Sequence, residues 1–214
     1  MIGYYNYTVI LTYVSLISSV LGIFFASGIN SSTPHPEYAM ICLMVSGLCD
    51  MFDGKIARTK TSRTDSEKQF GIQIDSLCDL ICFGLLPSVI GYSIGMNSWA
   101  DIPILVLFPL CAVIRLAYFN VSEDDRQKQT SEVRHVYEGL PVTSVALILP
   151  LLYSFRKDIG ADIFPNVYGI TLFLIALAFI TRFKVKKPGV KTMFSFIGVG
   201  AVELVWLLYK TKIK

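Results

Sequence analysis

Charged residues are scarce in this 214-residue chain: Asp, Glu, Lys and Arg together make up 16% of it, whereas hydrophobic residues make up 53%. Average soluble domains carry about 25% charged residues. With a mean hydropathy of +0.57, this composition excludes an ordinary soluble domain and indicates a polytopic membrane protein, which we expect to form a single domain over residues 1–214. The net charge of +3 is small, and no nucleic-acid partner is expected.

Histidine is also scarce, with two residues, and the five cysteines lie in apolar stretches without the paired spacing of a zinc site. We interpret these cysteines as buried small hydrophobes, and no disulfide is implied. The first apolar run is long enough to span a membrane and lacks a basic segment before it, so a cleavable signal peptide is not expected. The sequence contains no internal repeat or low-complexity tract.

Apolar runs separated by polar turns predict an all-α membrane helix bundle with six core transmembrane helices. The expected spans are residues 9–28, 38–58, 70–96, 102–120, 139–155 and 163–183. A further apolar segment covers residues 192–209. A full seventh span there would carry the C-terminal lysines to the side that has few basic residues, so this segment is expected to be short, tilted or broken.

Basic residues gather in the loops on one side of the predicted bundle, while the opposite loops hold only Arg156 and Lys157. Because cytoplasmic loops are enriched in Lys and Arg, the basic side is predicted to face the cytoplasm. The basic side comprises Lys55, Arg58, Lys60, Arg63, Lys68, Arg126, Lys128, Arg134, Arg182, Lys184, Lys186, Lys187 and Lys191. A multi-pass protein of the cell membrane is therefore expected.

Four aspartates, Asp50, Asp53, Asp75 and Asp79, lie within otherwise apolar stretches near the basic side. Spacings of three and four residues place each pair on one helix face. Counted from the loop between the two helices, Asp50 and Asp79 are at equal depth, roughly 12 Å along at 1.5 Å per residue. Two antiparallel helices would therefore bring all four carboxylates together, and such acids at membrane depth normally mark function.

Four adjacent carboxylates repel one another unless a cation neutralises them. Carboxylate oxygens are hard ligands that suit Mg²⁺, Mn²⁺ or Ca²⁺. The pattern therefore predicts a metal site, with room for two ions about 3.5–4 Å apart. A cation transporter that uses the aspartates as an ion path is the alternative from another class, although the repeats typical of transporters are absent.

The residues around these aspartates resemble the signature of the CDP-alcohol phosphotransferase family at all eight fixed positions. These positions, called the signature below, are Asp50, Asp53, Gly54, Ala57, Arg58, Gly71, Asp75 and Asp79. Other segments, such as Phe83–Pro87, Arg115–Asn120 and Gly139–Pro141, resemble the phosphatidylserine synthases of that family. Tyr118 departs from the Arg that is common at its position.

The resemblance implies a transferase that moves the phosphatidyl group of CDP-diacylglycerol to L-serine, in a homodimer embedded in the lipid bilayer. Its metal ligands would be Asp50, Asp53 and Asp75, with Asp79 as general base and further ligand for two Mg²⁺ or Mn²⁺ ions. CDP would bind at Asp53, Gly54, Ala57, Arg58 and Gly71. We expect Arg115 and Asn120 to bind the acceptor. Inositol phosphate and glycerol phosphate remain alternative acceptors, although they need more basic residues than this site offers.

Overall fold

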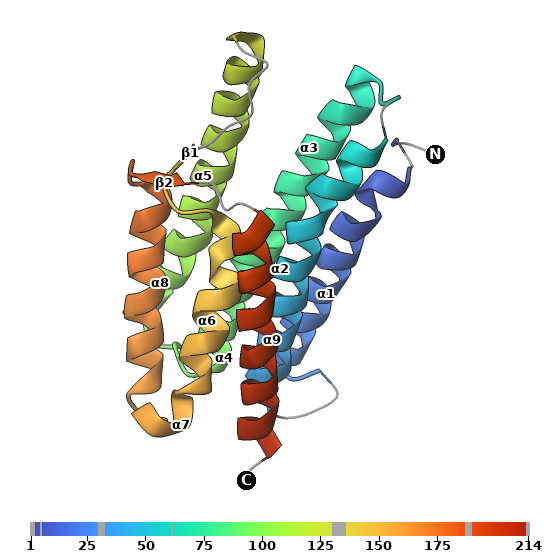
Figure 1. Ribbon diagram of the computed structural model, residues 1–214. Helices are drawn as coiled ribbons and strands as arrows, with labels where there is room; N and C mark the ends of the chain where they lie inside the picture. The colour runs from blue at the N-terminus through green and yellow to red at the C-terminus, as the bar shows by residue number, and fades with distance from the viewer. Residues whose placement is uncertain are drawn as a thin grey trace.

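The computed structural model describes residues 3–4, 6–29, 33–60, 62–129, 136–186 and 190–212. Its helices run side by side in an elongated bundle (Figure 1). The ends of α2, α3 and α5 project at one end of the bundle, whereas α7 and the C terminus lie at the other end (Figure 1).

The elements follow one another in the order of the predicted spans. The helices are α1 (Ile10–Ala26), α2 (Pro36–Thr59), α3 (Asp65–Asp79), α4 (Leu86–Ser93), α5 (Ile102–Gln129), α6 (Val145–Ser154), α7 (Arg156–Ile159), α8 (Phe164–Ile180) and α9 (Val190–Lys212). Short helical turns η1 (Tyr7–Val9) and η3 (Val142–Ser144) precede α1 and α6, and a π-helical stretch, η2 (Leu80–Leu85), joins α3 to α4. Strands β1 (Val136–Glu138) and β2 (Lys184–Lys186) pair antiparallel.

The part of the chain that the structure describes contains three helical stretches long and apolar enough to cross a membrane, Tyr7–Ala26, Asp65–Ser93 and Ile102–Arg126. Shorter apolar helices cover Val142–Ser154, Phe164–Ile180 and Ser195–Tyr209. The described part of the chain is thus an all-α bundle of the membrane-embedded kind, with one small antiparallel sheet of two strands. The count of six core spans stays a prediction.

The third helix begins at Asp65, five residues before the expected start at residue 70. Thr64 and Glu67 explain the difference, because they form a capping box: the Thr64 hydroxyl accepts from the Glu67 N–H at 3.2 Å, and a Glu67 carboxylate oxygen accepts from the Thr64 N–H at 2.8 Å. This arrangement satisfies two backbone donors that a helix start otherwise leaves free. The polar residues between 65 and 70 are therefore helical rather than loop.

One further boundary differs from the predicted spans. The helix expected to end at residue 120 continues as α5 to Gln129, where ion pairs three and four residues apart support its charged end, among them Arg126 with Glu123 at 2.6 Å. The antiparallel pairing of β1 with β2 was not expected. Of the basic residues used to predict orientation, Arg134 and Lys187 lie outside the described residues.

The last apolar segment forms one continuous helix, α9, of 23 residues. It follows β2 and runs to the end of the bundle where α7 lies (Figure 1). The segment is therefore not broken, whereas its apolar part, Ser195–Tyr209, is one of the shorter apolar helices, as expected.

Small residues allow the first helices to approach one another closely. A Cβ on Gly22 would lie 2.9 Å from the Cβ of Cys42, and one on Gly47 would clash with the Cβ of Ala146 on α6. Beside these contacts the Ser19 and Ser46 hydroxyls form a hydrogen bond at 2.8 Å. Close backbone approach and polar contacts of this kind hold membrane helices together where a hydrophobic driving force between them is weak.

Candidate metal and nucleotide site

The four aspartates come from two helices, with Asp50 and Asp53 on α2 and Asp75 and Asp79 on α3. One carboxylate oxygen each of Asp50, Asp75 and Asp79 lies within 4.8 Å of the other two. We call these three residues the aspartate cluster. The predicted meeting of the two helix faces thus brings three of the four carboxylates into one group.

Asp53 lies one turn from Asp50 on α2 and is buried, with 8% of the residue exposed. Neighbouring ionised carboxylates repel one another unless a proton or a cation lies between them, because both are acceptors only. The donor set of the cluster, three hard oxygen ligands from two neighbouring helices, fits a divalent cation such as Mg²⁺ or Mn²⁺.

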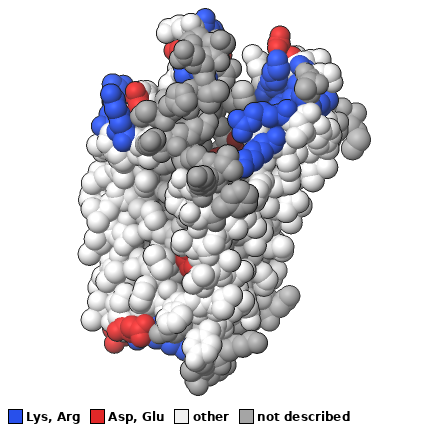
Figure 2. All heavy atoms as spheres, viewed as in Figure 1, with Lys and Arg blue, Asp and Glu red and all other residues white. Residues whose placement is uncertain are grey.

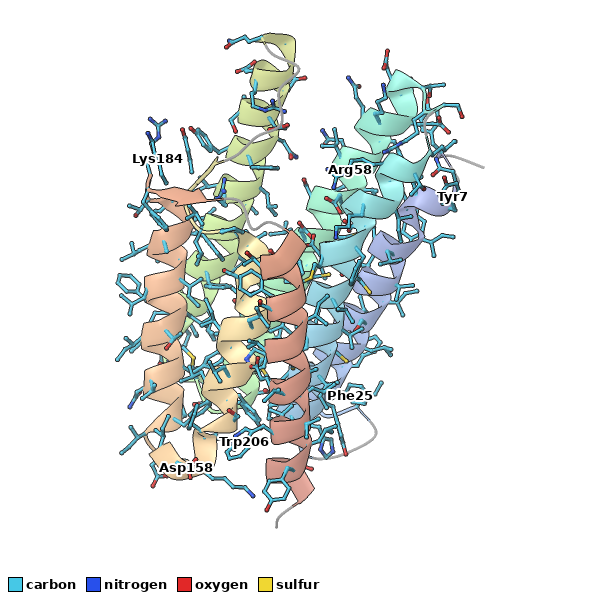
Figure 3. All side chains as sticks on the ribbon, in the orientation of Figure 1. Tyr7, Phe25, Arg58, Asp158, Lys184 and Trp206 are labelled. Carbon is cyan, nitrogen blue, oxygen red and sulfur yellow. The ribbon has the colours of Figure 1, made fainter. Side chains whose placement is uncertain are left out.

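Toward the bundle interior the aspartate cluster is closed. Cys82 and Phe83, one turn beyond Asp79, are fully buried in the apolar core. At the opposite side the site approaches the charged end of the molecule, where Lys and Arg side chains gather while most of the visible surface below is uncharged (Figure 2). Arg58, Lys184 and Tyr7 lie toward this end, and Asp158, Phe25 and Trp206 lie toward the other (Figure 3).

The two signature glycines occupy different surroundings. A Cβ built on Gly54 would meet no atom within 4 Å, whereas one on Gly71 would lie 2.6 Å from Nη2 of Arg63. Arg58 is exposed and Ala57 is half-buried on the same stretch of α2. Open space beside the backbone is thus present at Gly54, while the corresponding space at Gly71 holds the Arg63 guanidinium.

Asn120 lies beside the helix that carries Asp75. Its amide Nδ2 donates to the Ser76 hydroxyl oxygen at 2.8 Å, which links α5 to α3 next to the aspartate cluster. Asn120 is therefore close to the residues with which it was expected to form the site.

Arg115 is 5% exposed and contacts a different segment. Its Nε donates to the Leu140 carbonyl at 3.1 Å, and its guanidinium lies 5.6 Å from the centre of the Phe119 ring. Burial with a backbone acceptor and an aromatic face makes Arg115 part of the packing between α5 and the segment before α6.

The Gly139–Pro141 segment closes the C-terminal end of α8. Gly139 has a φ of +76°, and a Cβ there would lie 3.1–3.4 Å from the carbonyl oxygens of Thr181, Phe179 and Ala178. The Leu140 N–H donates to the Ala178 carbonyl at 3.1 Å. A glycine is required here because a side chain would be strained and would collide with these carbonyls. The segment thereby presents the Leu140 carbonyl to Arg115.

The connection between α2 and α3 contains contacts that were not expected from the sequence. Glu67 accepts from Lys60 Nζ at 2.7 Å and from Asn6 Nδ2 at 3.4 Å, in addition to its part in the capping box. The Tyr7 and Thr59 hydroxyls are 3.0 Å apart. The pattern Thr64-x-x-Glu67 could have identified Glu67, whereas the position of Arg63 depends on a loop shape that no sequence pattern specifies.

Comparisons with known proteins agree on one family. A family model described as CDP-alcohol phosphatidyltransferase matches residues 5–183. A CDP-diacylglycerol–serine O-phosphatidyltransferase of Saccharomyces cerevisiae is 37% identical over 140 residues, which cover 64% of this chain and 49% of the relative. One of Mycobacterium leprae is 27% identical over 159 residues, covering 72% and 50%.

An archaeal relative, the archaetidylserine synthase of Methanothermobacter thermautotrophicus, is 32% identical over 126 residues, which cover 58% of this chain and 50% of the relative. The chain thus spans about half the length of the curated relatives it matches. Helix α9 lies beyond the part that the family model matches.

Proposed function

Because the chain belongs to the CDP-alcohol phosphatidyltransferase family, we propose that it transfers the phosphatidyl group of CDP-diacylglycerol to the hydroxyl of L-serine and releases CMP. The observation that carries this proposal is the aspartate cluster, because residues from both halves of the family signature form it within a matched membrane bundle. Relatives named as serine O-phosphatidyltransferases support serine as the acceptor.

Donor binding follows from the position of the site in the bundle. We propose that the diacylglycerol tails lie in the bilayer against the apolar helices beside α2 and α3. We propose that the nucleotide lies along Asp53, Gly54, Ala57, Arg58 and Gly71. Arg58 is permanently charged and exposed at this end, which suits contact with phosphate. The bare backbone at Gly54 leaves room for the nucleotide.

The residues that would hold the divalent cations are Asp50, Asp53, Asp75 and Asp79. We propose Mg²⁺ or Mn²⁺, with two ions, because the oxygen donors fit hard cations. When bound, such ions neutralise the pyrophosphate and stabilise the charge that develops on the departing CMP.

Asp79 is proposed as the general base. Its carboxylate takes the proton from the serine hydroxyl, the serine oxygen forms a bond to the β-phosphorus that carries the lipid, and the bond from that phosphorus to the bridging oxygen breaks. The bridging oxygen leaves on CMP with the bonding electrons. Arg115 and Asn120 are proposed to bind serine, and Asn120 is held beside Asp75 by its bond to Ser76.

The distribution of charge supports an orientation. Lys and Arg gather at the end of the bundle near Arg58 and Lys184 (Figures 2 and 3), so we propose that this end faces the cytoplasm of a cell whose membrane the six core helices span. Residues 1–214 would act as one domain, with α9 packed against α2 and α6. A homodimer is proposed from the family resemblance alone.

An acceptor panel tests the function. The purified protein is given CDP-diacylglycerol in lipid vesicles with L-serine, inositol phosphate or glycerol phosphate, with and without Mg²⁺ or Mn²⁺. CMP release and the product lipid on thin-layer chromatography are expected only with serine and a divalent cation. Release with a phosphorylated acceptor instead would reassign the substrate, and cation flux into liposomes without CMP release would favour a transporter.

A further inference from the structure

Arg63 bridges the two helices that carry the signature. Its Nη1 lies 3.4 Å from the Ala57 carbonyl at the end of α2, and its Nη2 lies 3.2 Å from the Glu67 carbonyl in the first turn of α3. The same Nη2 would be 2.6 Å from a Cβ on Gly71. The guanidinium thus lies against two signature residues, Ala57 and Gly71, although Arg63 itself belongs to the spacer between the two halves of the signature.

The charge of Arg63 has no anionic partner among the residues that the structure describes. Nearby Lys60 pairs with Glu67 at 2.7 Å, and Lys68 pairs with Asp65 at 3.2 Å. Within the same described set, the Nε of Arg63 is buried and lacks any hydrogen-bond partner. Among the described residues, two hydrogen bonds to neutral carbonyls, at 3.4 and 3.2 Å, are the guanidinium's polar contacts.

A half-buried guanidinium without an anionic partner is energetically unfavourable. Buried charges are usually paired, because removing them from water is costly. A phosphate group is a suitable partner, since its oxygens match the planar fork of a guanidinium. The neighbouring signature residues belong to the part of the site that we assign to the nucleotide, so an anionic ligand would arrive beside this group.

We propose that Arg63 is a binding residue for the cytidine nucleotide and that its guanidinium pairs with a phosphate of the CDP group. This inference rests on the proposed function for the class of the ligand. It adds a contact from outside the signature. The proposal also explains the glycine at position 71. Because Gly71 has no side chain, the Arg63 guanidinium can lie against α3, beside the residues that we assign to nucleotide binding.

The test is equilibrium binding of CDP, CMP and cytidine to the full-length protein in lipid nanodiscs, with no acceptor present. Arg63→Gln is expected to weaken CDP and CMP binding about 10- to 100-fold, the usual range for a lost charge-assisted contact, and to leave cytidine affinity unchanged. The ratio of wild-type to variant affinity for CDP should be the same in Mn²⁺ and in EDTA, because the Arg63 contact does not depend on a metal. Arg63→Lys, which keeps the charge, should recover part of the affinity.

Lys68→Ala serves as the matched control, because it removes the same charge from an exposed position on α3 and should leave CDP affinity unchanged. Thermal unfolding without nucleotide checks that each variant is folded. If the Arg63→Gln variant does not fold, the CDP affinity of the Arg63→Lys variant is compared with that of the wild type instead. Equal CDP affinity in wild type and the Arg63 variants would overturn the inference while leaving the proposed function intact. An equal loss for cytidine and CDP would overturn the phosphate contact. A wild-type protein that binds no CDP would refute the function as well.

Discussion

Gly54→Ala should change stability and nucleotide affinity in opposite directions. Gly54 lies inside α2, and an added Cβ would meet no atom within 4 Å. Alanine at an interior helix position is more favourable than glycine by about 0.5–1 kcal/mol, because glycine loses more backbone freedom on folding. The variant should therefore unfold about 1–4 °C higher than the wild type if it follows the usual scaling for chains of this length.

The same methyl group should weaken donor binding, because we propose that the nucleotide packs against this bare stretch of backbone. Adding a methyl to a filled contact costs about 1–3 kcal/mol, which corresponds to about a 5- to 150-fold loss of affinity. Binding of CDP and the KM for CDP-diacylglycerol report this loss, and thermal unfolding of the ligand-free protein reports stability.

Gly198→Ala is the matched control for this prediction. A Cβ on Gly198 would also meet no atom within 4 Å, and this residue lies inside α9, outside the part matched by the family model. It should give the stability gain without any loss of CDP affinity. A Gly54→Ala protein that is more stable and binds CDP as tightly as the wild type would refute the proposed approach of the nucleotide to α2.

Four further outcomes are expected. Asp75→Asn should abolish CMP release while the protein stays folded. Excess EDTA should abolish CMP release by the wild type, and added Mn²⁺ should restore it. Asn120→Ala and Ser76→Ala each remove one partner of a 2.8 Å hydrogen bond. In a double-mutant cycle the double variant should therefore lose no more activity than the more impaired single variant, and additive losses would show that the two residues are not coupled. Glu203→Leu should raise the free energy of unfolding by about 1–3 kcal/mol, because both buried carboxylate oxygens of Glu203 lack a hydrogen-bond partner among the described residues. A lower free energy of unfolding in the variant would refute this prediction. Gly139→Ala should lower the unfolding temperature through strain at a φ of +76° and contact with three carbonyls; an unchanged melting curve would refute it.

Hydropathy and spacing predicted most of the bundle and the meeting of the aspartates. Apolar runs specify helices of membrane length, and the period of the helix determines that Asp75 and Asp79 share a face. The equal depth of Asp50 and Asp79 from the intervening loop predicted that their carboxylates would approach, and the structure places them within one cluster.

Helix ends were predicted less well, because local polar contacts decide them. Hydropathy marks where a helix enters the apolar region, whereas α3 begins earlier, at its Thr64 cap, and α5 continues through ion-paired residues beyond Asn120. The pairing of β1 with β2 joins segments almost fifty positions apart, and a three-residue strand is too short to show a periodicity that would predict it.

The surroundings of Gly71 could not be predicted from the sequence. A glycine in a signature indicates that a side chain is excluded, but it does not tell which group fills the space. In the structure the Arg63 guanidinium fills it and also donates to the Glu67 carbonyl in the first turn of α3. Such a contact depends on tertiary geometry and not on local pattern.

We propose that Asp50, Asp75 and Asp79 hold divalent cations and that these cations bind the nucleotide of the lipid donor. Anomalous diffraction from crystals grown with Mn²⁺ and CDP can locate the ions. Anomalous density is expected within coordination distance of these three carboxylates and of the CDP phosphates, and it should be lost in Asp75→Asn crystals. Manganese bound elsewhere, with CDP in place and no ion at the aspartates, would contradict it.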